Sequence, residues 1–535
     1  MAYSVGKVTI PEFESTAVDL IPAIASNVRA TFRTNKSKNL EWRRVQLRKL
    51  YWAVEDYKDE LLTALMNDLH KSTYEALLTE LEWVKNDCLF MIKNLEKFAK
   101  EEKMPKGAVP ATFSLMGFRQ RKEPLGAVLI IGPYNYPVQL LLAPLVGAIG
   151  AGCTAVIKPS ELTPSCAMVM KEMIEKRMDP NGFAVVNGAI PETNALMNEK
   201  WDKVFFTGSA QVGAIIAKKA AETLTPVCLE LGGKNPAFVT KNANLAMAAK
   251  RLLWGKTMNA GQVCMSQNYV LVDREVVPTF IEFLKIAYKE MFPNGAKASP
   301  DLARIVNKRH FARLKKMLDD TKGKIVMGGE LDESELYIEP TAVLVDSTDD
   351  SMMQEESFGP IFSIYPVFTL DQAIAIANSV HRTPLSLYAF GSKAENKKIL
   401  DSTISGGASI NDSFQHGSLN TVPFGGVGDS GWGAYRGKAS FDCFTHVRVL
   451  AETPYWADFL LRIRYMPFDW KRFNTFRKMT TQKPDFDRNG VVTKGLGYWV
   501  SLVLGLGGKG LKGALARWFV VLAGYYTLEL YKARK

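Results

Sequence analysis

Apolar residues recur about every 3.6 positions between charged residues in the first hundred positions of the chain. From Asn39 to about Lys100 these apolar residues are mainly leucine and valine. No glycine or proline occurs between Asn39 and Pro105. This period places apolar side chains on one face of a helix. The pattern therefore predicts helical structure from Asn39 to about Lys100 that packs its apolar face inside the protein, and it indicates no functional site there.

Apolar runs of strand length alternate with helical stretches after Pro105. Strands are predicted at 126–132, 155–158, 184–187 and 203–207, with an apolar helix at 138–149. A second alternating unit begins at Leu229 and continues to about Gly433. Such alternation predicts an α/β fold with parallel sheets and right-handed crossovers. Ligands bind such sheets at the carboxyl ends of the strands, where Lys158, Thr207, Gly208 and Ser209 fall.

Composition places the protein among globular intracellular proteins. Its 535 residues are too many for one ordinary core, and 47% hydrophobic with 23% charged residues excludes a disordered chain. The six cysteines form no C-x-x-C pair, and the five histidines form no H-E-x-x-H motif. We therefore expect neither a metal site nor a disulfide framework, and a reducing compartment. The N-terminal residues lack the pattern of a secretory signal.

Positive charge is concentrated at the C-terminus. The net charge is +12, and residues 454–535 carry 15 Lys or Arg against 5 Asp or Glu. A basic tail favours an anionic membrane surface as its partner, and nucleic acid is not expected.

One cysteine stands in a setting that suits nucleophilic chemistry. Cys264 follows a small, polar stretch in which Ala260 and Gly261 leave room for a substrate to approach. A thiolate can attack a carbonyl if donors stabilise the developing oxyanion. Taken alone, Cys264 is better explained as a small buried hydrophobe.

Seven short segments resolve this ambiguity, because together they resemble one family in its own order. They are Pro133–Pro137, Ile157–Glu161, Phe206–Ser209, Leu229–Pro236, Asn259–Cys264, Glu355–Pro360 and Pro423–Gly431. The chain resembles the aldehyde dehydrogenases from about Asn39 to Val449, and within them the class 3 branch that includes the fatty aldehyde dehydrogenases. The resemblance implies a Rossmann-like cofactor domain joined to an α/β catalytic domain.

The resemblance implies three catalytic residues. Cys264 would attack the aldehyde, and the Asn135 side chain with the Cys264 backbone N–H would hold the oxyanion. Glu230 would activate the water that hydrolyses the thioester. Two alternatives stay open: Asn135 could merely cap its own turn, and Glu230 could be a strand-end carboxylate paired with Lys234.

Eight further residues match the family's cofactor positions. They are Lys158, Glu161, Thr207, Gly208, Ser209, Val212, Glu356 and Phe358. An acidic residue at the adenosine ribose favours NAD, although NADP is possible. The start of the helix after Gly208 suits the pyrophosphate. Phe358 could instead be a core residue.

Tyr134 and Ser357 depart from the family's usual Trp and Ile, and we expect them to affect substrate fit.

The tail resembles the continuation found in fatty aldehyde dehydrogenases. Gly495–Gly508 and Trp518–Leu528 are apolar but shorter than the roughly 20 residues that span a bilayer. Three arrangements of the tail are possible. They are a marginal span from about Gly513 to Tyr531, helices that lie in the membrane interface, and a buried hairpin. We expect attachment to a membrane or lipid droplet through residues 454–535. The catalytic body would face the cytosol, at the endoplasmic reticulum, the mitochondrial outer membrane or a lipid droplet.

The expected organisation follows from these segments. It comprises an N-terminal extension (1–38), a helical and dinucleotide-binding domain (39–228), a catalytic domain (229–433), an oligomerisation strand (434–453) and the tail (454–535). The resemblance implies a homodimer, paired through a hairpin arm at about 112–122 and a strand at 441–450.

The expected activity is oxidation of medium- or long-chain aliphatic aldehydes to carboxylic acids with NAD(P)+. Two rivals are an acylating enzyme, in which CoA takes the acyl group, and a catalytically silent membrane or lipid-droplet scaffold. Glu230 argues against the first rival. The presence of Cys264, Glu230 and Asn135 together argues against the second.

Overall fold

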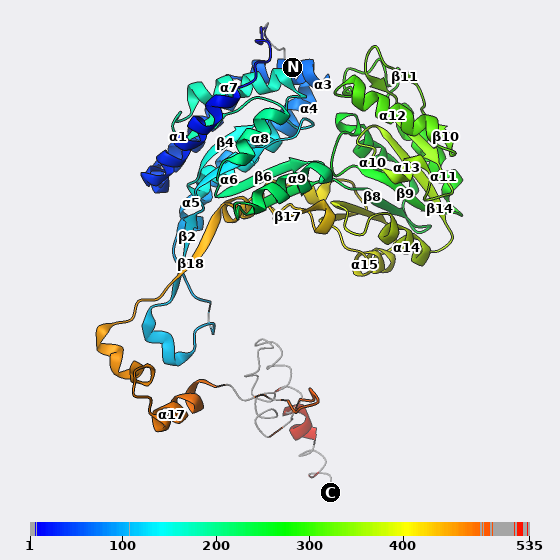
Figure 1. Ribbon diagram of the computed structural model, residues 1–535. Coiled ribbons are helices and arrows are strands. Elements are labelled where there is room, and N and C mark those ends of the chain that lie inside the picture. The colour runs from blue at the N-terminus through cyan, green and yellow to red at the C-terminus, as the bar shows by residue number, and fades with distance from the viewer. Residues whose placement is uncertain are drawn as a thin grey trace. The chain divides into compact units, whose positions relative to one another are not determined.

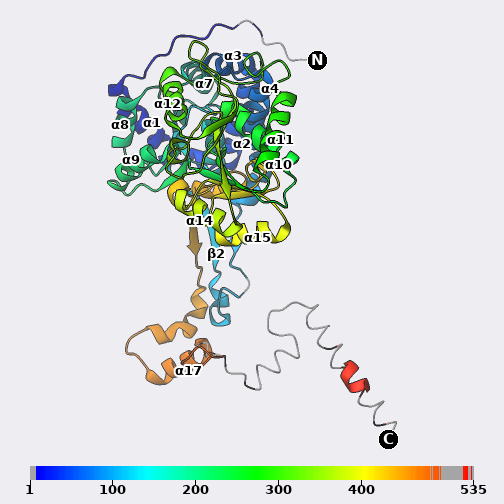
Figure 2. The ribbon, with the colours of Figure 1, turned by 90° about the vertical axis from the view of Figure 1, so that its right-hand side faces the viewer.

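The computed structural model describes residues 6, 8–105, 107–481, 484, 486–492, 495, 518, 522–527 and 532. Contacts divide the chain into a larger unit, residues 1–102 with 120–449, and a smaller unit, residues 103–119 with 450–535. Figures 1 and 2 show the ribbon from two directions. Every predicted catalytic and cofactor-binding residue lies in the larger unit.

A six-stranded sheet forms the first half of the larger unit and confirms the predicted α/β pattern. Its order is β17-β7-β6-β3-β4-β5, and short β17 runs antiparallel to β7 while the other pairs are parallel. The strands are β3 (Ala127–Ile131), β4 (Thr154–Lys158), β5 (Phe183–Val185), β6 (Lys203–Gly208), β7 (Val227–Leu231) and β17 (Gly431–Trp432).

Helices cover both faces of this sheet because its strands are apolar on both faces (Figure 1). Leu129 of β3 packs in a cluster with α1 (Ile21–Arg33), α8 (Ile190–Asn198) and α9 (Ala210–Ala221). Its neighbour Val128 points the other way, into the cluster that holds the opposite layer. That layer consists of α2 (Leu40–Asp56), α5 (Glu82–Ala99), α6 (Gln139–Ala151) and α7 (Pro164–Arg177).

The predicted helical region after Asn39 is confirmed, as several helices. Between α2 and α5 lie α3 (Lys58–Leu69), α4 (Thr73–Ala76) and a π-helical turn, η3 (Leu77–Leu81). The first break is at Tyr57 and the second at His70, whose φ of 50° lies in the left-handed region.

The predicted N-terminal extension also contributes to the core, because Ile21, Ala25 and Val28 are fully buried. It includes η1 (Val18–Leu20) and η2 (Lys36–Lys38) beside α1.

A seven-stranded sheet forms the second half of the larger unit. Its order is β10-β13-β14-β9-β8-β15-β16, antiparallel at β10 and parallel elsewhere. The strands are β8 (Asn235–Val239), β9 (Gln267–Asp273), β10 (Lys324–Met327), β13 (Thr341–Leu344), β14 (Ile361–Val367), β15 (Ser386–Phe390) and β16 (Gly407–Ile410). A separate ribbon pairs β11 (Leu331–Asp332) with β12 (Tyr337–Ile338).

Helices and turns complete this half. They are α10 (Leu245–Thr257), η5 (Met258–Gly261), α11 (Val277–Met291), α12 (Lys308–Asp320), α13 (Ser351–Gln354), α14 (Leu370–Val380), α15 (Lys393–Ser402), η6 (Gln415–Gly417), η7 (Gly428–Ser430) and α16 (Lys438–Cys443).

The chain passes between the sheets at two glycines. Strand β7 crosses the predicted domain boundary at 228/229 and pairs with β6, so the first sheet continues to Leu231. Residues 232–234 then lead directly into β8. A Cβ atom at Gly232 would lie 2.4 Å from Glu356 Oε2, and one at Gly233 would lie 2.7 Å from the His381 ring. The carboxyl edge of the first sheet therefore meets the amino edge of the second at close range.

A three-stranded sheet includes the predicted late strand. Its order is β1 (Glu102–Lys103), β2 (Arg119–Pro124) and β18 (Thr445–Leu450). The arm predicted at about 112–122 is a strand only from Arg119, because Ala111–Met116 forms a 3-10 helix, η4. Subunit pairing through these elements stays a prediction.

The smaller unit contains η4, a long 3-10 helix η8 (Tyr455–Arg464) and α17 (Trp470–Thr480). Arg119 pairs with Glu452 at 2.9 Å, and Phe113 meets Phe476 edge to face at 6.2 Å. Among the residues that the structure describes, no helix is both long and apolar enough to cross a membrane. Of the predicted apolar stretch 495–508 only Gly495 is described, and of 518–528 residues 518 and 522–527 are described, so membrane attachment stays a prediction.

Candidate active site

The strand order brings the predicted site residues to one edge of the first sheet. Asn135 follows β3, Lys158 ends β4, and Gly208 ends β6. Glu230 of β7 is paired in register with Thr207 of β6. Because parallel strands share one carboxyl edge, residues nearly a hundred positions apart become neighbours there, as the sequence predicts.

Cys264 reaches this edge from the second sheet. It lies between η5 and β9, and its carbonyl accepts a hydrogen bond at 2.8 Å from Nδ2 of Asn235, the first residue of β8. The preceding turn is unusual, because Asn259, Ala260 and Gly261 all have positive φ. The residue as a whole is half-buried. The turn thus presents Cys264 at the amino edge of β8 and β9, opposite β7.

Asn135 is fixed beside the cysteine segment by hydrogen bonds across the two halves. Its Nδ2 donates to Gln262 O at 3.0 Å, two residues before Cys264. Asn259 Nδ2 donates to Asn135 O at 2.8 Å and to Gln262 O at 3.1 Å. Asn135 is only 2% exposed. The alternative that Asn135 merely caps its own turn is therefore wrong, because its amide reaches a distant segment.

A buried ion pair holds the Asn135 segment from the other side. Lys71 and Glu80 are both 0% exposed, and their charged groups lie 2.6 Å apart. Lys71 Nζ also donates to Asn135 O at 3.1 Å, while Glu80 Oε2 accepts the backbone N–H groups of Val138 and Gln139. A buried pair is stable only when its remaining hydrogen-bonding groups are also satisfied, and these contacts satisfy them. The pair therefore fixes both sides of the turn that carries Asn135.

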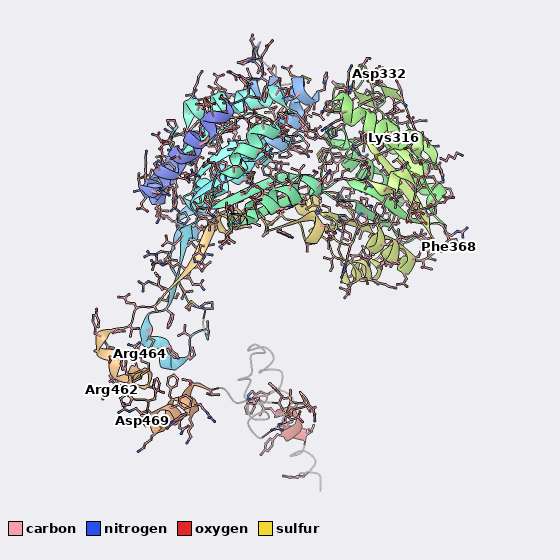
Figure 3. All side chains as sticks on the ribbon, viewed as in Figure 1. Lys316, Asp332, Phe368, Arg462, Arg464 and Asp469 are labelled. Atoms are coloured by element: carbon pink, nitrogen blue, oxygen red, sulfur yellow. The ribbon has the colours of Figure 1, made fainter. Side chains whose placement is uncertain are left out.

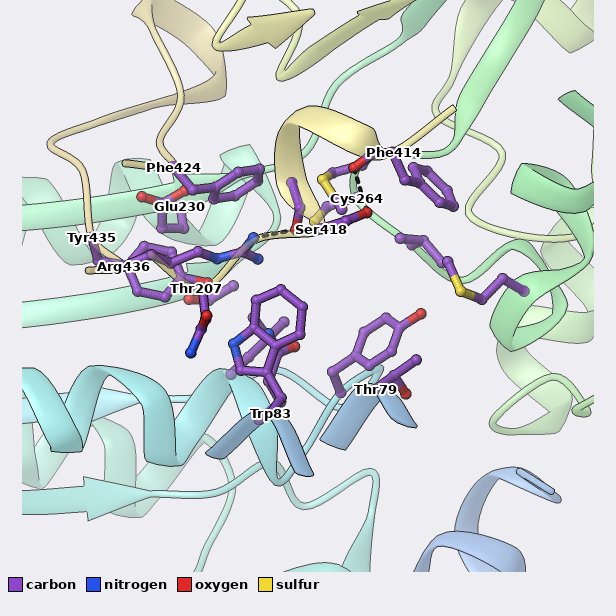
Figure 4. A pocket seen from close by; sticks show the side chains of 18 of the residues that line it. Thr79, Trp83, Thr207, Glu230, Cys264, Phe414, Ser418, Phe424, Tyr435 and Arg436 are labelled. Atoms are coloured by element: carbon purple, nitrogen blue, oxygen red, sulfur yellow. Dashed lines mark hydrogen bonds between the residues drawn. The ribbon is translucent and has the colours of Figure 1, made fainter. Parts of the chain in front are cut away.

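A cavity of about 380 Å³ contains the thiol of Cys264 and the carboxyl of Glu230 in its wall (Figure 4). Thr207, at the end of β6, lies in the same wall. Aromatic rings make up much of the remaining wall. They belong to Trp83, Tyr136, Trp254, Phe414, Phe424 and Tyr435. The cavity suits an apolar ligand whose reactive end lies between Cys264 and Glu230.

The first helices also contribute to this cavity, so the expectation that they carry no site is wrong. Leu78 and Thr79 of η3 and Trp83 of α5 lie in its wall. The helical period could not reveal this, because the same period describes residues that face a core and residues that face a ligand.

Glu230 is buried without a partner. It is 3% exposed, and neither carboxyl oxygen has a hydrogen-bond partner. Burial raises the pKa of Glu230 well above its usual range, and the positive charge of Arg436 opposes the rise. Lys234 instead donates to Met353 O and Gln354 O, each at 3.2 Å. The alternative that Glu230 pairs with Lys234 is therefore wrong.

The thiol of Cys264 is protonated at neutral pH. Burial raises its pKa to about 12, the nearby carboxyls of Glu356 and Glu230 add to the rise, and Arg436 opposes it. Since the thiolate is the nucleophile, the thiol must lose its proton to a base as it attacks. Glu230 lines the same cavity and can take this proton in its ionised form, in which a raised pKa makes it a stronger base than an ordinary carboxylate.

The predicted cofactor residues at β4 and β6 are arranged for a charged, hydroxyl-bearing ligand. Lys158 is buried, and its Nζ lies 3.4 Å from Glu161 Oε2. Ser209 caps α9 by accepting the Val212 N–H at 3.3 Å, and the first turn of that helix is exposed. Exposed N–H groups at a helix start suit a pyrophosphate. These features fit a dinucleotide lying over the edge of the sheet.

Glu356 lies near the Cys264 thiol, whose pKa its charge raises, and Phe358 follows it two residues later. Burial raises the pKa of Glu356 to about 7, and its Oε1 has no hydrogen-bond partner. Phe358 is partly exposed with a φ of 47°, and its ring packs edge to face on Tyr134 at 5.8 Å. An unpartnered carboxyl oxygen and a half-exposed ring fit a nicotinamide riboside better than a purely structural role.

The two departures from the family pattern do not lie in the cavity wall. Ser357 is buried, and its Oγ accepts a hydrogen bond from Lys256 Nζ at 2.8 Å. Burial lowers the pKa of Lys256 to about 7. Tyr134 packs on His310 and Phe358. Ser357 and Tyr134 shape the segment that carries Glu356. The effect on substrate fit that we expect from them is therefore indirect.

A parallel sheet that suits a dinucleotide, beside a cavity with a thiol and a basic carboxyl, is the arrangement of a nicotinamide-dependent oxidoreductase. The profile of the aldehyde dehydrogenase family matches residues 6–450. The chain belongs to this family. It is an aldehyde dehydrogenase, an enzyme that oxidises aldehydes with NAD(P)+.

Relatives and a solved structure agree with this assignment. The beta-apo-4'-carotenal oxygenase of Neurospora crassa is 71% identical, over 99% of each chain. Mouse aldehyde dehydrogenase family 3 member A2 is 39% identical, over 83% of this chain and 92% of its own. The substrate-bound structure of Staphylococcus aureus AldH matches with a TM-score of 0.82 at 38% identity, over 86% of this chain and 99% of its own. The resemblance to the class 3 branch is thereby confirmed.

Replacing Gly261 with alanine should reduce kcat/KM by about 100-fold or more, because small displacements of a catalytic group have effects of that size. A Cβ there would lie 2.1 Å from Gly359 O, and the residue's φ is +70°. The matched control is Gly295→Ala, with a φ of +87° but open space around the Cβ. NADH formation should be nearly normal in the control. Equal activity of the two variants would show that the close packing of this turn is not required.

Proposed function

We propose that the protein oxidises long, apolar aldehydes of the apocarotenal type to carboxylic acids, through covalent catalysis by Cys264 and hydrolysis promoted by Glu230. The observation that carries the proposal is the cavity in which these two groups share a wall that is otherwise rich in aromatic side chains. The 71% identity to a beta-apo-4'-carotenal oxygenase supports the substrate class.

Attack begins when the Cys264 sulfur forms a bond to the aldehyde carbon and the thiol proton passes to Glu230. The aldehyde oxygen becomes an oxyanion. Asn135, fixed beside Gln262, and the Cys264 backbone N–H are the donors that stabilise it. Because Lys71 and Glu80 fix the Asn135 turn, these donors are in place before the substrate arrives.

A dinucleotide held at Lys158, Glu161 and the start of α9 would supply the acceptor for the hydride on the aldehyde carbon, and the departure of this hydride would leave a thioester on Cys264. Glu230, after it has released the thiol proton to solvent, would remove a proton from water as the water attacks the thioester carbon. The carbon–sulfur bond breaks, the carboxylic acid forms, and the sulfur regains a proton. The raised pKa of Glu230 gives it the basicity that both proton transfers need.

The wall of the cavity favours a flat, conjugated chain. Six aromatic side chains line it, and offset or edge-to-face contacts between π systems stabilise such a ligand beyond the burial of its area. A saturated fatty chain, which the sequence predicts, would bury area in the same cavity without these contacts. Fatty aldehydes are therefore the second candidate, supported by the apolar character of the wall.

Kinetics with three aldehydes test the substrate class. Detergent-solubilised enzyme, with NAD+ and no CoA, should have a kcat/KM for beta-apo-4'-carotenal about tenfold or more above that for hexadecanal, and hexadecanal should exceed acetaldehyde because more apolar area is buried. A preference for hexadecanal would select the fatty aldehyde alternative. Turnover that requires CoA would identify an acylating enzyme, and no NADH under any condition would favour a silent scaffold.

We also propose that the tail docks on an anionic membrane or lipid-droplet surface. The large apolar side chains of Tyr455, Trp456, Phe468 and Trp470 are 64–100% exposed. Basic residues accompany them on η8 and α17, and Arg462 and Arg464 are labelled in Figure 3. Exposed aromatic rings beside clustered positive charge suit the boundary between headgroups and acyl chains.

Co-sedimentation with vesicles tests this docking. The full chain should sediment with phosphatidylserine-containing vesicles, more strongly at low salt, and the double variant Arg462→Glu and Arg464→Glu should bind several-fold less. The matched control makes the same charge change at Lys315 and Lys316 of α12, which lie in the larger unit. Equal loss in both variants, or no sedimentation of the wild type, would contradict docking through the tail.

A further inference from the structure

Arg436 is a buried arginine in the wall of the substrate cavity. It is 4% exposed and lies between β17 and α16, with a φ of 74° in the left-handed region. Its backbone N–H donates to Ser440 Oγ at 2.7 Å, which fixes this strained position. The side chain is directed into the cavity between Glu230 and Trp83 (Figure 4).

Aromatic rings and one carbonyl hold the guanidinium group in place. Its carbon lies 4.2 Å from the centre of the Phe424 ring and 4.8 Å from that of Trp83. Nη1 donates to Gly417 O, while the buried Nε has no hydrogen-bond partner. In the described part of the chain no ion pair involves Arg436, although its charge opposes the rise to about 7 that burial causes in the pKa of Asp87. Cation–π contacts offset only part of the cost of burying a charge.

The guanidinium group also lies close to the reacting thiol. Gly417, whose carbonyl it binds, packs so tightly on Met265 that a Cβ would lie 2.4 Å from the Met265 sulfur. Met265 directly follows Cys264, and all four residues line the cavity. Among the residues that line it, Arg436 is the one cation, whereas Glu82 and Glu230 are acids.

The reaction changes the charge of the ligand inside this cavity. A neutral aldehyde enters, and a carboxylate forms beside Glu230 in an apolar environment, where an unpaired anion is costly. A guanidinium with a free N–H group is the side chain best suited to pair with a carboxylate.

We propose that Arg436 forms a carboxylate-binding subsite in the substrate cavity, which holds the acid product and binds other apolar carboxylates of similar length. The inference rests on the proposed oxidation of apolar aldehydes, because that reaction generates the anion. It concerns binding after the chemistry, so the chemistry can be correct without it.

Binding measurements with decanoate and decan-1-ol test this subsite without turnover. By calorimetry, wild-type protein should bind decanoate about tenfold or more tightly than the alcohol, as expected for a charge-assisted hydrogen bond. Arg436→Met and Arg436→Gln should lose this preference, and Arg436→Lys should retain part of it. The matched control is Arg274→Met, because Arg274 is exposed and lies over Phe368 at 4.3 Å, a similar cation–π pair outside the cavity.

Two outcomes would overturn the proposal: wild-type protein that binds the alcohol as tightly as the acid, or a preference that survives in a folded Arg436→Met or Arg436→Gln protein. A measurement on wild type alone decides the case if these variants do not fold. The pKa of bound, carboxyl-labelled decanoate should be lower than in water by NMR titration if it pairs with a guanidinium. It should be higher if the acid merely lies in an apolar cavity. Because no aldehyde is used, failure of this test leaves the proposed oxidation intact.

Discussion

The whole site depends on the close approach of two sheet edges at Gly232 and Gly233. A Cβ at Gly232 would lie 2.4 Å from Glu356 and one at Gly233 would lie 2.7 Å from His381, so a side chain at either position would force a neighbour to shift. This constraint brings the carboxyl end of β7, with Glu230, to the amino ends of β8 and β9, where the turn before β9 presents Cys264. Neither sheet alone contains both groups. The fold therefore creates the catalytic pair at the junction between its halves.

Electrostatics at this junction are set by burial more than by ion pairs. Glu230, Glu356 and Cys264 all have raised pKa values with burial as the largest cause. A neutral thiol beside strongly basic carboxyls is a resting state that can transfer a proton when substrate arrives. Arg436 is the opposing charge at Glu230 and Cys264, where it lowers the pKa against the effect of burial. Lys71 and Glu80, by contrast, are fully paired and act on geometry alone.

The sequence predicted those features that depend on residues close together in the chain. Strand ends, the glycine-rich turns and the residues within short motifs were placed correctly, because their spacing follows from the covalent chain and from the shared edge of a parallel sheet. The cavity wall was not predicted, since it is assembled from segments between Leu78 and Arg436 that have no common pattern. Lys71, Glu80 and Trp83 were hidden in a helical stretch whose period gives no sign of what the buried face contacts. The unpaired state of Glu230 was also beyond prediction, because Lys234 is near it in sequence and turns elsewhere in space.

The most direct test of the account is to trap the covalent intermediate. Glu230→Gln protein, incubated for hours with NAD+ and a long-chain aldehyde and then quenched in acid, should have an acyl group on the peptide that contains Cys264 by mass spectrometry, although the group should form more slowly than in wild type because glutamine cannot take the thiol proton. The acyl group should persist far longer than in wild type, because water is no longer activated, and the peptide with Cys443 should be unmodified. An unmodified Cys264 peptide, an acyl group on another cysteine, or hydrolysis as fast as in wild type would contradict the roles assigned to these two residues.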